Sequence, residues 1–319
     1  MTLRVVMTGA TGFIGSAVLR RLTDPVVLAE RKVSVRALTR RHVPLPSGVE
    51  QVSADLTRPD SLSGVCSGAD VLVHAASHVG SDEQLCLQVN DLGTAALMQE
   101  AARAGVKRIV QLSTTAVYGR GPHRDAAATD LEPAPGSVTS RTRLAGEAHA
   151  LDQGGLVLRA GLVTGAGDRW VVPALAELTR RVPGYWMAGE ARLSMIAVED
   201  LARLITDAAL RLPAGGANGA YGIHHAVHPE PVRSRDLLDA LASLDILSPV
   251  SGELTWQECL SLMKKNPGRI SERQFALLAQ DHFYSGEFLW SACRTDPGPG
   301  PLARLTGAAG WYRSLLSRS

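Results

Sequence analysis

The 319-residue chain is 45% hydrophobic and has a mean hydropathy of +0.03, values typical of a globular protein with a large core. Its 33 Lys and Arg side chains outnumber the 31 Asp and Glu side chains by two, so the overall charge favours neither nucleic acid nor a membrane surface as a partner. No segment reaches the roughly 20 consecutive apolar residues of a membrane span, and the chain enters a strand pattern without a signal peptide, so we expect a cytoplasmic location.

The first predicted unit is a strand, a glycine-rich turn and a helix. The apolar run Val5–Met7 leads into Thr-Gly-Ala-Thr-Gly-Phe-Ile-Gly at 8–15, and an amphipathic stretch follows. Gly9 can adopt the backbone angles of a tight turn, Gly12 has no side chain to hold a phosphate away, and Gly15 lets the helix lie close to the strand. The free N–H groups at the helix start favour an anion. The pattern therefore predicts a binding site for a dinucleotide pyrophosphate.

Strand and helix patterns then alternate along the chain. Apolar or alternating segments predict the strands, and apolar residues at helical spacing predict the helices between them. The strands are expected at 33–38, 48–52, 69–75, 106–112, 157–159 and 192–197, and the helices at 59–66, 90–104 and 198–211. This alternation indicates an α/β fold with a Rossmann-like, doubly wound parallel sheet.

The pattern loosens beyond residue 165 and suggests a second unit. We expect 1–165 to form the dinucleotide-binding Rossmann domain, to which 192–225 returns, and 166–191 with 226–319 to form a smaller, mostly C-terminal substrate-binding lobe. Most aromatic residues lie from Trp256 onward. That distribution suits a lobe that covers a substrate and equally a self-contained helical core. The four cysteines are widely spaced, so we expect buried thiols and no metal site.

Doubly wound sheets bind their ligands beyond the carboxyl ends of the strands. The glycine turn and the predicted strand ends therefore supply the expected cofactor contacts. They are Gly9, Thr11, Gly12, Phe13, Ile14, Gly15, Arg40, Arg41, Asp55, Leu56, Ala75, Ala76, Ser77 and Leu112.

Several motifs follow one another in an order typical of one family. They are the T-G-x-x-G-x-x-G turn at 8–15, Asp-Leu at 55–56, His-Ala-Ala-Ser at 74–77, N-x-x-G-T at 90–94, Ser-Thr-Thr-Ala-Val-Tyr-Gly at 113–119, Arg-Leu-Ala-Gly-Glu at 143–147 and Val-Glu-Asp at 198–200. On these motifs the chain resembles the extended and atypical short-chain dehydrogenase/reductases, which include sugar-nucleotide epimerases, dehydratases and ketoreductases. The resemblance is dense to about residue 165 and thin afterwards. It implies a nicotinamide dinucleotide cofactor, with Ala160 and Val163 among its contacts.

The end of the second strand indicates which nicotinamide cofactor is bound. An acidic residue there would hydrogen-bond the ribose 2′-hydroxyl, whereas a cation accommodates a 2′-phosphate. The strand ends in Leu-Thr-Arg-Arg at 38–41, without a carboxylate. Arg40 first and Arg41 second are expected to contact the phosphate, so the sequence favours NADPH/NADP+.

Ketone reduction needs a hydride for the carbon, a proton for the oxygen and stabilisation of the forming alkoxide. In the family that this chain resembles, a Ser or Thr hydrogen-bonds the carbonyl, and a Tyr and a Lys four residues apart face the cofactor. Thr114 matches the first role, but Thr139 and Arg143 stand where the Tyr and the Lys are expected.

This departure removes the usual acid. A tyrosine serves because a nearby cation lowers its pKa from about 10, whereas a threonine hydroxyl is far too weak an acid and arginine stays protonated. Arg143 can still hold the nicotinamide ribose and place positive charge near an oxyanion. The proton can come from another side chain, from a water chain or from the substrate itself, such as a phenol beside the ketone; otherwise the protein is not an enzyme. The candidate side chains are His78, His123, Tyr185 and His224, with Tyr118 a weaker choice.

These features predict an atypical NADPH-dependent ketoreductase acting on a small-molecule ketone. The joint loss of Tyr and Lys resembles the angucyclinone ketoreductases of antibiotic biosynthesis, such as that of the simocyclinone pathway, which implies an aromatic polyketide as substrate. An NDP-sugar 4-ketoreductase is the alternative enzyme, and a non-catalytic NADP(H)-sensing regulator is the alternative outside enzymes. We expect no nucleic-acid or membrane partner, and the oligomeric state stays open. For the sugar nucleotide, the cations expected over the pyrophosphate are Arg169, Arg180, Arg181 and Arg192.

Overall fold

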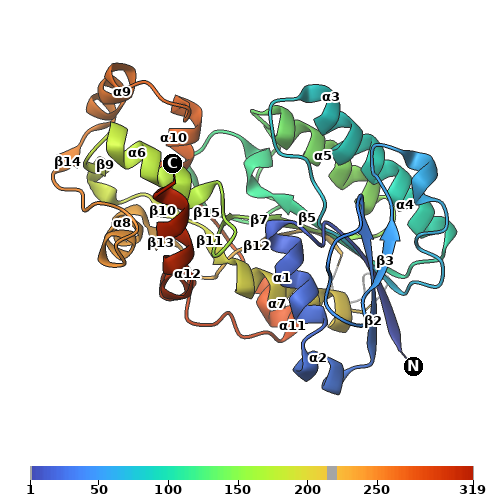
Figure 1. Cartoon of the computed structure of the whole chain (residues 1–319). Helices are drawn as coiled ribbons and strands as arrows, with labels where there is room; N and C mark the ends of the chain where they lie inside the picture. The colour runs from blue at the N-terminus through green and yellow to red at the C-terminus, as the bar shows by residue number, and fades with distance from the viewer. Residues whose placement is uncertain (1, 214–220, 319) are drawn as a thin grey trace.

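The computed structural model describes residues 2–213 and 221–318. Its centre is a parallel sheet of seven strands in the order β12-β7-β5-β4-β1-β2-β3 (Figure 1). This is the doubly wound α/β fold that the sequence predicts, and the predicted strands stand at nearly the expected bounds. The strands are β1 (Leu3–Thr8), β2 (Val33–Thr39), β3 (Glu50–Ser53), β4 (Val71–His74), β5 (Arg108–Thr114), β7 (Leu156–Ala160) and β12 (Gly222–Ala226).

Helices cover both faces of this sheet because successive strand residues point to opposite sides. Val5 and Met7 of β1 pack with α1, α7 and α11, whereas Val6 between them packs with α4 on the other face. The helical segments of this part are α1 (Phe13–Leu22), α2 (Pro25–Glu30), η1 (Pro59–Leu62), α3 (Glu83–Cys86), η2 (Leu87–Leu92), α4 (Gly93–Arg103), η3 (Thr115–Tyr118), α5 (Val138–Leu151), α7 (Val198–Arg211) and α11 (Glu287–Cys293).

A smaller lobe lies beside the sheet and has a hydrophobic core of its own (Figure 1). Its aromatic side chains include Trp186 edge-on to Phe275 and Trp256 stacked on Phe275, so these three form part of a self-contained core. The lobe contains β6 (His123–Ala126), β8 (Leu162–Thr164), α6 (Val171–Arg181), β9 (Tyr185–Trp186), η4 (Met187–Gly189), β10 (Arg192–Leu193), β11 (Met195–Ala197), β13 (Val232–Arg233), α8 (Ser234–Ser243), β14 (Glu253–Leu254), α9 (Trp256–Lys265), α10 (Glu272–Ala279), β15 (His282–Tyr284) and α12 (Pro301–Leu316).

Two predicted elements and the expected domain bounds differ in the structure. The helix expected at 59–66 is the single turn η1, because the backbone is extended at Ser63, with a ψ of 125°, and Gly64 follows with a φ of +77°. The strand expected at 192–197 divides into β10, which pairs with β13 and β15, and β11, which pairs with β8. The expected domain bounds also differ, because β6, β8, β10 and β11 lie in the lobe, whereas 287–293 form α11, whose Leu289 and Trp290 pack in the core of the large sheet.

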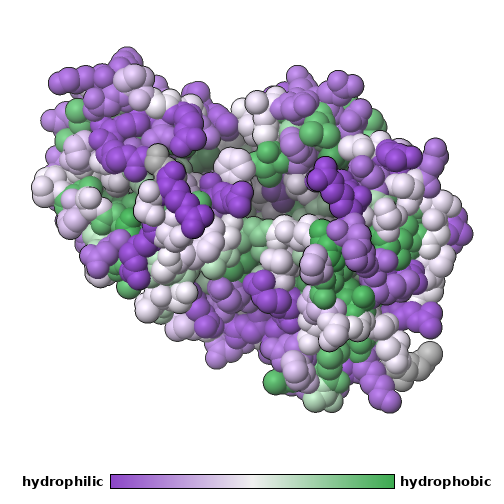
Figure 2. Space-filling view, viewed as in Figure 1, coloured by the Kyte–Doolittle hydropathy of each residue, from purple (hydrophilic) through white to green (hydrophobic). Residues whose placement is uncertain are grey.

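The other features of the chain agree with a globular core. All four cysteines are buried and unbonded, as the sequence predicts. Among residues 2–213 and 221–318, no helix is both long and apolar enough to cross a bilayer. The surface is hollowed between the lobe and the large sheet (Figure 2), on the side where β5 and β7 end.

Candidate functional site

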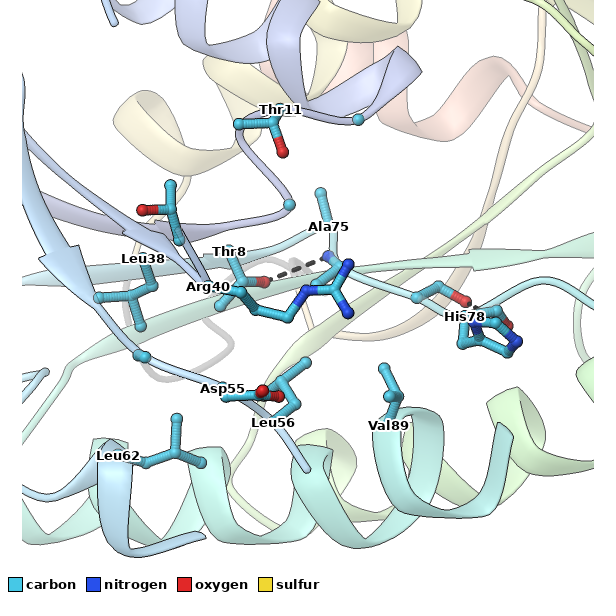
Figure 3. Close-up of a pocket in the computed structure, with 16 residues that line it drawn as sticks. Thr8, Thr11, Leu38, Arg40, Asp55, Leu56, Leu62, Ala75, His78 and Val89 are labelled. Carbon is cyan, nitrogen blue, oxygen red and sulfur yellow. Dashed lines mark hydrogen bonds between the residues drawn. The ribbon is translucent and has the colours of Figure 1, made fainter. Parts of the chain in front are cut away.

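A cavity of about 240 Å³ lies at the carboxyl ends of β1, β2 and β4, where the strand order reverses. Nine of the predicted cofactor contacts line it: Gly9, Thr11, Gly12, Arg40, Asp55, Leu56, Ala75, Ala76 and Ser77. Its other lining residues are Thr8, Leu38, Thr39, Ala54, Leu62, His78 and Val89. Leu38 and Leu62 lie at one end of this cofactor cavity and His78 lies at the other (Figure 3).

The glycine turn requires its glycines at two positions. Gly9 has a φ of +73°, and a Cβ there would lie 2.6 Å from the carbonyl carbon of Ala75. A Cβ on Gly15 would lie 2.0 Å from the carbonyl oxygen of Gly9, so only glycine lets α1 approach this turn. Gly12 is the N-cap of α1 and makes no side-chain capping bond, which leaves the first amides of the helix for an anion. The turn therefore fits a dinucleotide pyrophosphate.

His74 at the end of β4 fixes the neighbouring wall of the cavity. Its Nδ1 lies 2.7 Å from the Thr8 hydroxyl and its Nε2 lies 3.0 Å from the Thr94 hydroxyl. Thr8 Oγ1 also accepts a hydrogen bond from Ala76 N, as Figure 3 shows. Burial, together with the charge of Arg143, lowers the pKa of His74 to about 4, so this histidine is neutral and structural at pH 7.

Arg40 and Asp55 give the cofactor cavity its charge. Burial opposes ionisation of the Asp55 carboxyl, but hydrogen bonds from the Thr57 backbone and side chain, with Arg40 and Arg58 nearby, lower its pKa. The Arg40 side chain extends into the cavity (Figure 3). Arg41 lines an adjoining hollow of about 390 Å³ together with Arg40 and Asp55. Both arginines thus stand beside the place that the adenosine ribose would take.

Helix α5 carries three polar side chains on one face, spaced by four residues. The helix begins after a capping box between Ser137 and Ser140. Thr139 Oγ1 accepts from Gly80 N at 3.2 Å and donates to Gly80 O at 3.1 Å. Arg143 donates to the Leu112 carbonyl at 3.0 Å, and burial lowers its pKa to about 10, so it stays cationic at neutral pH.

The third side chain of this face is Glu147, which anchors α5 to the sheet. Its carboxylate accepts hydrogen bonds from Nε and Nη2 of the buried Arg159 of β7, and the closest N–O distance is 2.6 Å. The Ser113 hydroxyl donates to the same carboxylate. These contacts hold α5 across β5 and β7, beside Thr114.

Thr114 ends β5 and lines a separate cavity of about 70 Å³, between the large sheet and the lobe. Its Oγ1 accepts a hydrogen bond from Ala116 N at 3.1 Å, which leaves the hydroxyl hydrogen available to a substrate oxygen. We call this space the Thr114 cavity. Its lining residues carry no formally charged side chain; they are Thr114, Thr115, Ala116, Gly161, Leu162, Ser194, Leu277, His282 and Tyr284.

Thr139 and Arg143 line neither cavity. Seven predicted cofactor contacts likewise lie outside the cofactor cavity. Two of them are described above: Gly15, which packs on the Gly9 carbonyl, and Arg41, which lines the adjoining hollow. Phe13 and Ile14 begin α1 and are half-buried, Leu112 and Ala160 are buried in β5 and β7, and Val163 is half-buried in β8, where it pairs with Ile196.

The structure separates the candidate proton sources. His78 lines the cofactor cavity, whereas His123 lies against Tyr284 and His224 stacks on Phe288. Tyr185 hydrogen-bonds Asp239 within the lobe, and the buried Tyr118 hydrogen-bonds His225. Of the five, only His78 lines either of the two cavities described above.

The sequence interpretation missed the lobe residues that face Thr114. His282 and Tyr284 reach the Thr114 cavity because β15 pairs with β6 and β10. No local motif marks this three-residue strand. The sequence interpretation assigned Asn90 only to a motif at the start of a helix. In the structure the Asn90 side chain hydrogen-bonds both backbone groups of His78 and the hydroxyl of Thr142.

Among curated proteins, two reductases are similar to this protein over most of its length. It is 27% identical to 2-alkyl-3-oxoalkanoate reductase of Stenotrophomonas maltophilia over 86% of this chain and 84% of that one. It is 26% identical to a farnesyl dihydroquinoline-oxide ketoreductase of Stigmatella aurantiaca over 80% of this chain and 77% of the other. A shorter match, 36% identical to sterol demethylase protein B of Methylococcus capsulatus, covers 36% of each chain.

Comparison with solved structures shows the same fold. UDP-glucose 4-epimerase of Thermus thermophilus, in complex with NAD, has a TM-score of 0.70 at 22% identity, over 98% of this chain and 99% of the other. A dTDP-glucose 4,6-dehydratase of Streptomyces venezuelae has a TM-score of 0.72 at 19% identity, over 99% and 98%. The model of the NAD dependent epimerase/dehydratase family matches residues 5–223, so the chain belongs to this family.

Proposed function

We propose that this protein is an NADPH-dependent ketoreductase that reduces a ketone of an aromatic, angucyclinone-type polyketide in antibiotic biosynthesis. The observation that carries the reductase proposal is the placement of Thr114. Its hydroxyl hydrogen is available at the end of β5, the strand beside β4, and β4 leads into the wall of the cofactor cavity. Relatives with ketoreductase names over most of the chain support the same class of reaction.

The residues of the chain divide the work of such a reduction. A reduced nicotinamide dinucleotide in the cofactor cavity would supply the hydride. Thr114 donates a hydrogen bond to the carbonyl oxygen and stabilises the negative charge that develops there. Arg143, cationic and held by the Leu112 carbonyl, places a positive charge beside the end of β5. The glycine turn and the amides of α1 hold the pyrophosphate.

NADPH is favoured by the pair of cations at the end of β2. Arg40 and Arg41 both line the hollow beside Asp55, and the strand end carries no carboxylate of its own. A guanidinium group binds a 2′-phosphate through two parallel hydrogen bonds, a contact that the 2′-hydroxyl of NADH cannot replace.

An uncharged ketone is favoured by the lining of the Thr114 cavity. Leu162, Leu277 and Ala116 make much of its wall, and no cation faces it. Two of the arginines expected over a sugar nucleotide are engaged elsewhere, because Arg181 bonds backbone carbonyls of the lobe and Arg192 covers the Phe283 ring. The apolar wall and these engaged cations support an apolar substrate over an NDP-sugar.

The test is reduction of a panel of ketones that includes angucyclinones, simple aromatic ketones and NDP-4-ketosugars. We expect oxidation of NADPH with an angucyclinone and a preference for NADPH over NADH of at least about tenfold. Arg40→Ala should reduce that preference by weakening NADPH alone. Turnover of the sugar nucleotide alone would favour the 4-ketoreductase, and tight NADP+ binding without turnover of any ketone would favour a sensing protein.

A further inference from the structure

We propose that His78 is the catalytic acid that replaces the missing tyrosine and donates the proton to the substrate oxygen. This inference rests on the ketoreductase function proposed above. His78 belongs to the loop that follows β4, which we call the His78 loop (residues 77–80). Three observations support the assignment: the position of the imidazole, the hydrogen bonds that hold the backbone of the loop, and the contacts that His74 and His282 already make.

The topology brings His78 and Thr114 to the same edge of the sheet. Strands β4 and β5 are parallel neighbours, with His74 paired to Gln111, so the segments that follow them leave the sheet side by side. His78 lines the cofactor cavity at the end away from Leu38 and Leu62 (Figure 3). Leu38 and Leu62 stand beside Asp55, on the adenosine side of the cavity. The imidazole is therefore placed toward the nicotinamide end.

The backbone of His78 is held from two sides. Asn90 Oδ1 accepts from His78 N at 2.7 Å, and Asn90 Nδ2 donates to His78 O at 2.9 Å. Thr139 holds Gly80 through both of its backbone groups. Because these bonds use only main-chain atoms of the loop, they fix the backbone and leave the imidazole to face the cavity.

The position where the family carries its acid thus anchors the loop that carries His78. A Cβ built on Gly80 would lie 3.2 Å from His78 Nε2, so the imidazole touches the residue that Thr139 holds. In the family the proton donor is the side chain at the position of Thr139, whereas here it is in the His78 loop, which packs against Thr139. Thr139 acts as a positioning residue in this arrangement.

The buried histidines are not suited to the role. His74 uses both ring nitrogens on Thr8 and Thr94. His282 lines the Thr114 cavity, but it is 7% exposed, its Nδ1 meets the Gln280 carbonyl, and its Nε2 lies against Gly121. Burial lowers the pKa of His282, which favours its neutral form. His282 is nevertheless the rival acid that an experiment must exclude.

When a reduced nicotinamide dinucleotide is bound, it would supply the hydride for the new C–H bond at the carbonyl carbon, while the electron pair of the C=O π bond goes to the oxygen. The oxygen, held by Thr114, takes the proton from an N–H of the His78 imidazolium and becomes the alcohol. Neutral His78 regains a proton from solvent before the next turnover.

The experiment compares His78→Gln, His282→Gln and the matched control His224→Gln, whose ring stacks on Phe288 outside both cavities. Each variant is titrated with NADP+ by calorimetry and assayed for NADPH oxidation with the ketone that the wild type reduces. We expect His78→Gln to bind NADP+ within about threefold of the wild type and to lose about 100-fold in kcat, whereas His224→Gln keeps its kcat. Added imidazole should restore part of the turnover of His78→Ala.

A second readout does not depend on turnover. Carbethoxylation of His78 by diethyl pyrocarbonate, followed by peptide mass spectrometry, should slow when NADP+ is bound. The proposal would be overturned if His78→Gln kept its kcat, or if it lost NADP+ affinity to the same extent as kcat. A larger loss of kcat in His282→Gln, or a modification rate of His78 that NADP+ does not slow, would also overturn it. If the wild-type protein reduces no ketone, the proposed function itself is wrong. That outcome is distinct from failure of the His78 proposal, which is judged by differences among the variants.

Discussion

In the proposed reaction, Thr114 donates the hydrogen bond that stabilises the reacting oxygen. Its hydroxyl oxygen accepts a hydrogen bond from Ala116 N, and its hydroxyl hydrogen is available to donate. We expect Thr114→Val, which keeps the shape and removes the donor, to lower kcat/KM by about 100- to 1,000-fold while NADP+ affinity stays unchanged. The matched control is Thr129→Val, on an exposed loop beside Asp130, which should retain full activity. Equal activity of Thr114→Val and wild type would remove Thr114 from the reaction.

Thr139 should behave as a loop anchor when it is replaced. Thr139→Ala removes both bonds to Gly80 and should lower stability by about 1 to 3 kcal/mol and kcat by a modest factor. Thr139→Ser keeps the hydroxyl and should restore both quantities. Urea unfolding and steady-state kinetics measure the pair, and an activity loss in Thr139→Ser as large as in Thr139→Ala would argue against an anchoring role.

Residues with a purely local reason for their identity are the ones that the sequence predicts well. Gly15 is required by its contact with the Gly9 carbonyl, and the φ of +73° in the tight turn already favours glycine at position 9, where the segment after β4 also leaves no room for a Cβ. The absent acid at 139 is equally visible, because it depends only on spacing from 143. His282 and Tyr284 are not predictable in this way, since a β-strand pairing brings them to Thr114 from far along the chain.

At the scale of elements, α5 is held to the sheet by a buried ion pair. Glu147 and Arg159 are both almost fully buried, so removal of one charge leaves the other without compensation. We expect Glu147→Gln to lower the free energy of unfolding by about 3 to 5 kcal/mol. The control is Glu83→Gln, which breaks the exposed Glu83–Arg141 pair between α3 and α5 and should cost less than about 1 kcal/mol. Urea denaturation distinguishes them, and similar losses in both variants would contradict this account.

The hydrophobic pattern of the sequence predicts the strands of the large sheet, whereas it does not predict those of the lobe. A strand buried on both faces, such as β4 or β7, shows itself as a continuous apolar run. Strands β10 and β11 are separated by Ser194 and join different sheets, and nothing in their sequence marks that division. The same holds for α11, whose apolar face suits either core and whose position is set by contact with α7.

The large sheet and the lobe are joined by contacts of one buried histidine, His225, beside the Thr114 cavity. His225 of β12 lies 2.7 Å from the Tyr118 hydroxyl through Nε2, and its Nδ1 meets the Ser285 carbonyl next to β15. Burial lowers the pKa of His225 to about 4, as it does for His74. Both rings are therefore neutral in the folded protein and become charged only when the protein opens or the pH falls far below neutral.

This burial makes the whole molecule sensitive to mild acid. An unfolded histidine titrates near pH 6.5, so between pH 6.5 and 4 the unfolded chain binds more protons than the folded one, and stability falls as the pH falls. Each of the two histidines should cost about 2 kcal/mol of stability between pH 7.5 and pH 5. We expect His225→Asn, which cannot be protonated, to lose about 2 kcal/mol less than the wild type over this interval, measured by urea unfolding at both pH values. His42→Asn, at an exposed position, should follow the wild type. If His225→Asn and the wild type lose the same stability between these pH values, protonation of His225 does not cause the loss. Acid would then destabilise the protein at a site other than the junction between sheet and lobe.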